Sequence, residues 1–187
     1  MYSRFICGLL AIACTFPAWA DSYTIDPTHT FPAFEIDHLG FSTQRGRFNL
    51  TQGKLMLDED KKTGSVDIII DAASIDTGLA KLEEHLRAED FFDVKRYPTL
   101  QFSGDKFRFI EDRLVAVSGN LSLHGVTLPV TLNVTRYKCG LNVARLRKVC
   151  GADMSTTIKR SEYGMSKGTP FVGDEVKITI QVEAVRD

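Results

Sequence analysis

Several motifs of covalent catalysis are missing from this 187-residue chain, and their absence narrows the classes of function. The sequence holds no G-x-S-x-G nucleophile turn, no phosphate-binding P-loop and no G-x-G-x-x-G after a strand. No pair of carboxylates stands out against the 24 Asp and Glu residues. The sequence therefore favours a non-enzymatic protein and predicts no catalytic residue.

An excess of either sign of charge is also missing. The chain has 23 Lys and Arg residues against 24 Asp and Glu, a formal net charge of -1. A nucleic-acid surface or a polybasic membrane patch needs a strong positive excess. We interpret the short basic group Arg145, Arg147 and Lys148 as a solvated loop and expect no nucleic-acid partner.

Metal-ligand spacing is absent among the four histidines, His29, His38, His85 and His124. The sequence thus predicts no metal site, although a site assembled from distant positions stays open. His38 has the parity of Phe34 and Ile36, which we place on the inner face of a strand. A buried histidine needs a partner, so His38 is either a satisfied core residue or holds the polar end of a ligand.

Apolar runs long enough to span a membrane are missing as well. Residues 1–20 have one arginine, an apolar stretch and the small-x-small end Ala18-Trp19-Ala20. This pattern predicts a signal peptide cleaved after Ala20, and residues 21–187 then form a single domain. Lipidation at Cys14 is the alternative, but Ala11 stands where a lipoprotein signal would have leucine.

Cysteine is scarce in the mature chain, where only Cys139 and Cys150 remain. Two leftover cysteines in an oxidising compartment usually pair. The spacing fits no zinc motif. We therefore predict a disulfide that closes a short loop.

Alternating apolar and polar residues dominate what is present. Val176, Ile178 and Ile180 alternate with polar neighbours, and the runs from Val66, Phe107 and Leu128 do the same. This period of two predicts antiparallel strands with one apolar face and one solvent-exposed face. Turn residues at 62–64, 111–113 and 124–126 separate the runs, and 100–137 is typical of a three-strand meander. Roughly eight strands fit, a number that suits a closed barrel.

One charged segment interrupts the strands, HLRAEDFFDVKRYPTLQF at 85–102. Leu79, Leu82 and Leu86 form an apolar stripe at helical spacing, with Asp76 or Thr77 as expected N-cap. Asp90 is expected to cap a second short turn. The helix either covers one end of the barrel or packs on its outside, and the pattern does not decide between them.

Several stretches together resemble the YceI-like family of secreted bacterial proteins: YTIDPTHT, FEIDHLGFSTQRGRF, HLRAEDFFDVKRYPTLQF, GNLSLHGVTLPV and RSEYGM. The resemblance covers Ser22 to Arg186. It implies an all-β fold, an eight-stranded antiparallel lipocalin-like barrel with one helix and a short helical turn near the opening. It also implies a periplasmic protein whose long internal cavity holds an apolar isoprenoid lipid or isoprenoid quinone.

On this resemblance we assign candidate ligand-binding residues. They are aromatic, aliphatic or polar side chains of the matching motifs and strands: Phe34, Ile36, His38, Phe41, Arg45, Phe48, Ile68, Arg87, Asp90, Phe91, Phe102, His124, Arg160, Tyr163 and Met165. An arginine could pair with a phosphate or polarise a quinone carbonyl. Surface ion pairing is the other interpretation of each arginine.

The resemblance favours a carrier that binds a polyisoprenoid or a ubiquinone-type lipid and has no covalent cofactor. The alternative is a quinone-dependent redox protein or a partner of a membrane b-type cytochrome. A third possibility is a barrel filled by its own phenylalanines. Monomer and homodimer both stay open.

Overall fold

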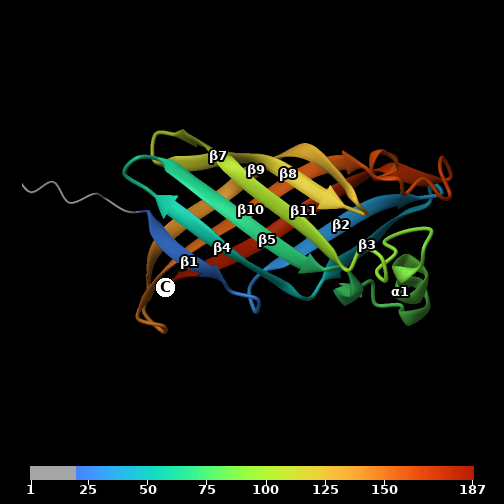
Figure 1. The fold of residues 1–187 in the computed structure, drawn as a ribbon, viewed down its shortest axis with the longest axis horizontal. Coiled ribbons are helices and arrows are strands. Elements are labelled where there is room, and N and C mark those ends of the chain that lie inside the picture. Colours follow the sequence, from blue (N-terminus) through green and yellow to red (C-terminus); the bar gives the residue numbers. More distant parts are fainter. Residues whose placement is uncertain (1–19) are drawn as a thin grey trace, which may run out of the picture.

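The computed structural model describes residues 20–187, most of which lie in strands (Figure 1). The predicted signal peptide and Cys14 fall on residues outside this range, so cleavage after Ala20 and lipidation stay predictions. Among the described residues, no helix has the length and apolar character needed to cross a membrane.

Eight antiparallel strands close into a barrel. In order around the ring they are β1 (Asp21–Ile25), β4 (Thr51–Asp58), β5 (Thr63–Asp71), β7 (Thr99–Ile110), β8 (Arg113–Leu123), β9 (Val126–Asn142), β10 (Arg147–Lys159) and β11 (Val172–Arg186). β1 pairs with both β4 and β11, which closes the ring. The predicted eight-stranded barrel and its β7–β9 meander are confirmed.

Three further strands lengthen one side of the wall: β2 (Phe31–His38), β3 (Ser42–Phe48) and β6 (Ile75–Asp76). The long strand β11 pairs with β1 near its carboxyl end and with β2 from Val172 to Gln181. The extension reaches toward the single helix α1 (Ala80–Arg87), which lies at one end of the barrel (Figure 1). Two 3₁₀ turns, η1 (Ala72–Ser74) and η2 (Arg160–Tyr163), complete the fold.

The predicted alternation determines which side chains face inward. Val176, Ile178 and Ile180 of β11 all line the barrel interior, as do Val182 and Ala184. Lys177 and Gln181 between them are exposed. Branched side chains suit this arrangement because they pack well on a pleated, half-buried surface. Val66, Ile68 and Ile70 of β5 follow the same rule.

The helix begins later than the sequence predicted. Leu79, not Asp76 or Thr77, is the N-cap, and no side chain caps it. Asp76 belongs to β6, where its carboxylate accepts hydrogen bonds from Asn49 and from the N–H of Gly78. These bonds hold Asp76 against the sheet. The segment around Asp90 forms hydrogen-bonded turns and not a helical turn; the short helical turns of the described residues are η1 and η2.

Candidate functional site

A single long cavity of about 580 Å³ occupies the barrel interior. Its wall consists almost wholly of apolar side chains from the inner faces of the strands, among them Ile36, Ile68, Phe102, Leu132, Ile158 and Ile180. Many of these side chains are only half-buried because they face the empty interior rather than each other. The barrel is therefore not filled by its own phenylalanines.

The cavity opens at the end where α1 lies. Of the described residues that line it, four are exposed to solvent: His38, His85, Lys167 and Gly168. They come from the end of β2, from α1 and from the loop between η2 and β11, which together surround the opening. We call this opening the mouth.

Helix α1 and the turn after it cover part of the mouth. Leu82 and Leu86 line the cavity, whereas Leu79 is 59% exposed and takes no part. Phe91 and Phe92 follow on the same side, and the ring of Phe92 lies edge-on to Phe48 with centroids 5.5 Å apart. The helix thus packs over the barrel end and not on the outer wall, which decides between the two alternatives that the sequence left open.

An ion pair crosses the mouth. Lys167, in the loop before β11, pairs with Asp90, in the turn after α1. Both side chains are about half exposed. An exposed pair of this kind stabilises little, about 0–1 kcal/mol, so it can open at low energetic cost.

Arg160 holds the loop that forms one side of the mouth. Its side chain is 5% exposed and donates four hydrogen bonds to backbone carbonyls, those of Met165, Lys167, Val172 and Gly173, over 2.6–3.1 Å. Burial lowers the pKa of this guanidinium, with the nearby Asp174 carboxylate opposing the shift. Because four donors are bound to carbonyls, Arg160 positions the loop.

Two other candidate arginines also have protein partners. Arg87 donates to the carbonyls of Ala73 and Ile75, both at 2.9 Å, which fixes α1 against β6. Arg45 lies on the outer face, 65% exposed, and pairs with Glu35 at 3.1 Å. Neither side chain lines the cavity. The arginines at these positions are structural contacts or surface ion pairs.

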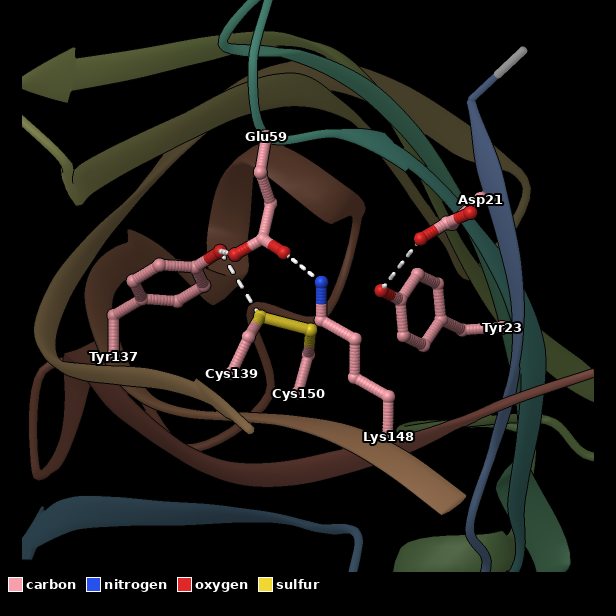
Figure 2. Close-up of a disulfide and its surroundings, with 7 residues drawn as sticks. All are labelled: Asp21, Tyr23, Glu59, Tyr137, Cys139, Lys148 and Cys150. Carbon is pink, nitrogen blue, oxygen red and sulfur yellow. Dashed lines mark hydrogen bonds and ion pairs between the residues drawn. A yellow bond between two sulfur atoms is a disulfide. The ribbon is translucent and has the colours of Figure 1, made fainter. Parts of the chain in front are cut away.

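At the far end of the barrel, polar side chains surround a disulfide (Figure 2). Cys139 and Cys150 are direct partners across β9 and β10 and form the predicted disulfide. Around it Tyr137, Glu59 and Lys148 point toward one another, with Lys148 paired to Glu59 and the Tyr137 hydroxyl donating to Glu59 over 3.4 Å. Tyr137 and Cys150 also form the deep end of the cavity wall.

These far-end groups hold their protons more strongly than usual. Burial, and then the Glu59 carboxylate, raises the pKa of Tyr137. The hydrogen bond to Glu59 raises the pKa of Lys148, against the effect of burial. Burial also raises the pKa of Tyr23, which is fully buried beside them. No lining residue at this end is exposed within the described part of the chain, so the cavity is blind here.

A separate polar cluster lies at the β1–β2 connection, where Asp26, His29 and Glu183 approach one another. The buried Asp26 carboxylate accepts hydrogen bonds from Thr28 and lies 2.6 Å from the guanidinium of Arg145. Burial alone would raise the pKa of Asp26, but the bonds from Thr28 and His29 and the charge of Arg145 outweigh it and lower the pKa. A guanidinium already occupies the place beside this carboxylate that a cation would take.

Comparison with known proteins agrees with this architecture. The model of the YceI-like domain matches residues 23–184. The chain belongs to the YceI-like family. A UPF0312 protein of Pseudomonas paraeruginosa is 34% identical over 172 residues, which cover 90% of this chain and 89% of that protein. A UPF0312 protein of Vibrio campbellii is 37% identical over 70% of this chain and 71% of its own.

Solved structures share the YceI-like barrel. Burkholderia cenocepacia BcnA superposes with a TM-score of 0.74 at 25% identity, covering 85% of this chain and 98% of that chain. The Campylobacter jejuni YceI protein gives a TM-score of 0.70 at 26% identity, covering 81% and 90%. A Saccharophagus degradans domain described as polyisoprenoid binding gives 0.67 at 20% identity, covering 88% and 98%, which shows the fold alone.

The YceI-like barrel brings nine of the candidate residues to the cavity wall: Phe34, Ile36, His38, Phe48, Ile68, Phe91, Phe102, Arg160 and Met165. His38 lies at the mouth and is exposed, so the expectation that it is buried was wrong. Strand β2 ends at His38 and leaves the wall there.

The other six candidates do not line the cavity. Besides Arg45 and Arg87, Asp90 bonds to Lys167 outside the wall and Phe41 is 91% exposed. His124 occupies a tight turn at φ 52°, and its Nδ1 lies 3.0 Å from the carbonyl of the buried Tyr163. His124 and Tyr163 thus join two loops at the barrel end.

Sequence reasoning missed three polar residues at the mouth, Gln44, His85 and Lys167. The spacing of Leu82, His85 and Leu86 could have revealed His85, because positions i, i+3 and i+4 share one helix face. Gln44 is opposite Ile36 in the β2–β3 pairing and could follow from strand register. Lys167 lies in an irregular loop, where the sequence has no periodicity from which the direction of a side chain could be predicted.

Proposed function

We propose that this protein is a periplasmic carrier that holds a long-chain isoprenoid lipid or isoprenoid quinone inside the barrel. The observation that carries the proposal is the cavity itself, apolar along its length, blind at one end and open at the other. Such a shape fits a ligand with one long apolar chain and one polar end.

Burial of the chain supplies the binding free energy on this proposal. Each methylene removed from water contributes roughly 0.8 kcal/mol. Carriage by burial needs no covalent step. It would let a molecule that cannot stay dispersed in water cross the aqueous periplasm.

The polar end of the ligand would lie at the mouth. His38, Gln44, His85 and Lys167 line the cavity there, and they offer hydrogen-bond donors and one full positive charge. The deep end offers mainly Leu57, Cys150 and Ala184. We therefore expect the chain to enter tail first. A phosphate or a quinone carbonyl could each accept hydrogen bonds from the groups at the mouth.

Two observations support the choice of ligand class and location. The Saccharophagus degradans protein of the same fold is described as polyisoprenoid binding. The Cys139–Cys150 disulfide suits an oxidising compartment, as does the signal-like sequence of residues 1–20.

Mass spectrometry of what co-purifies tests the proposal. The mature protein is isolated from the periplasm without detergent, denatured in organic solvent, and the extract analysed. A stoichiometric polyprenyl lipid or quinone is the expected result. A clean extract from protein that also fails to take up added ubiquinone would contradict the proposal.

A redox comparison separates carriage from electron transfer. A carrier should retain ubiquinone and ubiquinol equally, because burial of the tail supplies most of the affinity. Electron exchange between the loaded protein and a membrane b-type cytochrome would favour the redox alternative.

A further inference from the structure

Two loops at the mouth present apolar side chains directly to solvent. Phe41 is 91% exposed, Phe171 is 72% exposed and Leu39 is 46% exposed. The loops lie side by side, because the N–H of Leu39 donates to the carbonyl of Phe171 over 3.0 Å. Figure 1 shows the β2–β3 connection and the loop before β11 together at the end of the barrel that carries α1. We call Leu39, Phe41 and Phe171 the rim.

The rim continues the apolar surface of the cavity outward. His38 and Val172, the chain neighbours of Leu39 and Phe171, both line the cavity. A lipid tail that leaves the cavity between these loops would pass Val172 and then the exposed apolar side chains of the rim.

Packing does not explain the rim. A phenylalanine that is 91% exposed buries almost nothing and contributes little to stability. Leu39 has φ 60° and is followed by Gly40 at φ 72°, a hairpin turn in which asparagine is the favoured first residue. A leucine there is conformationally unfavourable.

The charges of the two loops are compatible with phosphate head groups. Residues 38–44 and 163–173 contain no Asp or Glu, in a chain that has 24 of them. They carry His38, which is exposed, and Lys167, which is half exposed and pairs with Asp90 through a contact that can open at low energetic cost. Aromatic and aliphatic side chains beside a cation are typical of segments that lie in a membrane interface.

We propose that the rim docks the mouth onto the surface of a lipid bilayer, so that the ligand passes between membrane and cavity without crossing water. This inference rests on the proposed carrier function. The occupant is a bilayer because the opening between these loops leads into a lipid-sized apolar cavity.

The far end supplies a matched control. The β9–β10 hairpin tip exposes Leu141 (68%) and Val143 (79%) at the opposite end of the barrel, close to Arg145 and Arg147. The tip resembles the rim in exposed apolar surface but does not border the mouth. If the hairpin tip were the membrane anchor, its arginines would contribute to the binding, and vesicle binding would weaken steeply with salt.

The experiment compares the double variant Phe41→Ser/Phe171→Ser with Leu141→Ser/Val143→Ser. Sedimentation measures binding to vesicles of phosphatidylethanolamine and phosphatidylglycerol at low and high salt. Stopped-flow mixing measures the rate at which the protein takes up ubiquinone from vesicles that contain it. We expect the rim variant to lose vesicle binding and uptake rate by about tenfold or more, since two phenylalanines dominate the buried apolar area. The amount of ubiquinone held at equilibrium should not change, and the hairpin variant should match the wild type.

A third variant excludes a folding defect. Leu39→Asn suits the turn, so it should melt at or above the wild-type temperature while still weakening vesicle binding. Wild-type behaviour of all rim variants, absence of vesicle binding by the wild type, or salt-sensitive loss in the hairpin variant alone would each overturn the proposal. A wild type that binds vesicles through the rim but holds no ubiquinone would instead contradict the carrier function.

Discussion

The two ends of the barrel are built from different chemistry. The mouth is bordered by irregular loops, a two-turn helix and an exposed ion pair between Lys167 and Asp90. The far end is stapled by Cys139–Cys150 and closed by Tyr137, Glu59 and Lys148. The mouth is held by separate weak contacts, whereas the far end has a covalent link and a partly buried hydrogen-bond network. On the proposed carrier function, we expect a ligand to enter and leave at the mouth.

Stability is distributed in the same way. The β9–β10–β11 ladder runs in nearly continuous register toward the far end, where it meets β1. At the mouth, the loop of residues 164–171 has no strand partner and depends on the hydrogen bonds of Arg160. Low local stability is expected of segments that move during binding.

The largest effect should follow from a charge placed inside the cavity between the two ends. Ile68→Arg puts a guanidinium among apolar side chains, so a bound tail would leave that charge without water, and lipid retention should be abolished. Ile69→Arg is the matched control, because Ile69 is the next residue on β5 and faces outward with 37% exposure. Extraction and mass spectrometry measure retention, and circular dichroism checks the fold. Equal retention by both variants would argue against an interior site.

Much of the cavity wall was predictable from the sequence, because alternate residues of a strand face opposite sides of the sheet and the apolar ones face the interior. Alternation identified Ile68, Ile36 and the inner residues of β11 before the structure placed them. The arginines were not predictable in the same way. Arg160 and Arg87 bind carbonyls of irregular segments, and only the folded backbone shows which carbonyls lack partners. Phe41 was assigned from the family resemblance, yet it follows the end of β2 at His38 and is 91% exposed.

The second largest effect is expected from a substitution that loosens the loop at the mouth. Arg160→Met removes four hydrogen bonds and leaves buried carbonyls unpaired, which should lower the free energy of unfolding by about 3 kcal/mol. Amide exchange should rise first in residues 164–173, and ubiquinone should dissociate faster. Arg45→Met, at an exposed arginine, should change stability by less than about 0.5 kcal/mol. Uniform exchange along the chain would show that Arg160 does not act on the loop.

Removing the disulfide probes the far end. The link closes a short loop, because its cysteines have a sequence separation of 11, and its loss should destabilise the protein by about 2–3 kcal/mol in the chain-entropy model. For a domain of this size the melting temperature should fall by about 5–10 °C. The double variant Cys139→Ser/Cys150→Ser should still retain lipid, because the mouth is unchanged. Lipid loss without a lower melting temperature would reverse the roles assigned to the two ends.

The smallest effect is a dependence of stability on alkaline pH. Tyr23, Tyr137 and Lys148 at the far end have raised pKa values, from burial for the tyrosines and from the Glu59 hydrogen bond for Lys148. Groups with a raised pKa keep their protons longer in the folded state than in the unfolded chain. Their stabilisation is therefore complete below the unfolded pKa of about 10 and is lost as the pH rises through the folded pKa.

The midpoint of urea unfolding should accordingly stay level up to about pH 9 and fall above about pH 10. Burial raises the pKa of Tyr163 near the mouth as well, so Tyr137→Phe should make this fall shallower without removing it. Tyr97→Phe alters a tyrosine outside the far-end network, whose ring lies edge-on to His124 with ring centroids 4.8 Å apart, and serves as the control. A fall of equal slope in both variants would mean that the far-end network is not what alkaline pH disrupts, because of these two tyrosines Tyr137 is the one that bonds to Glu59.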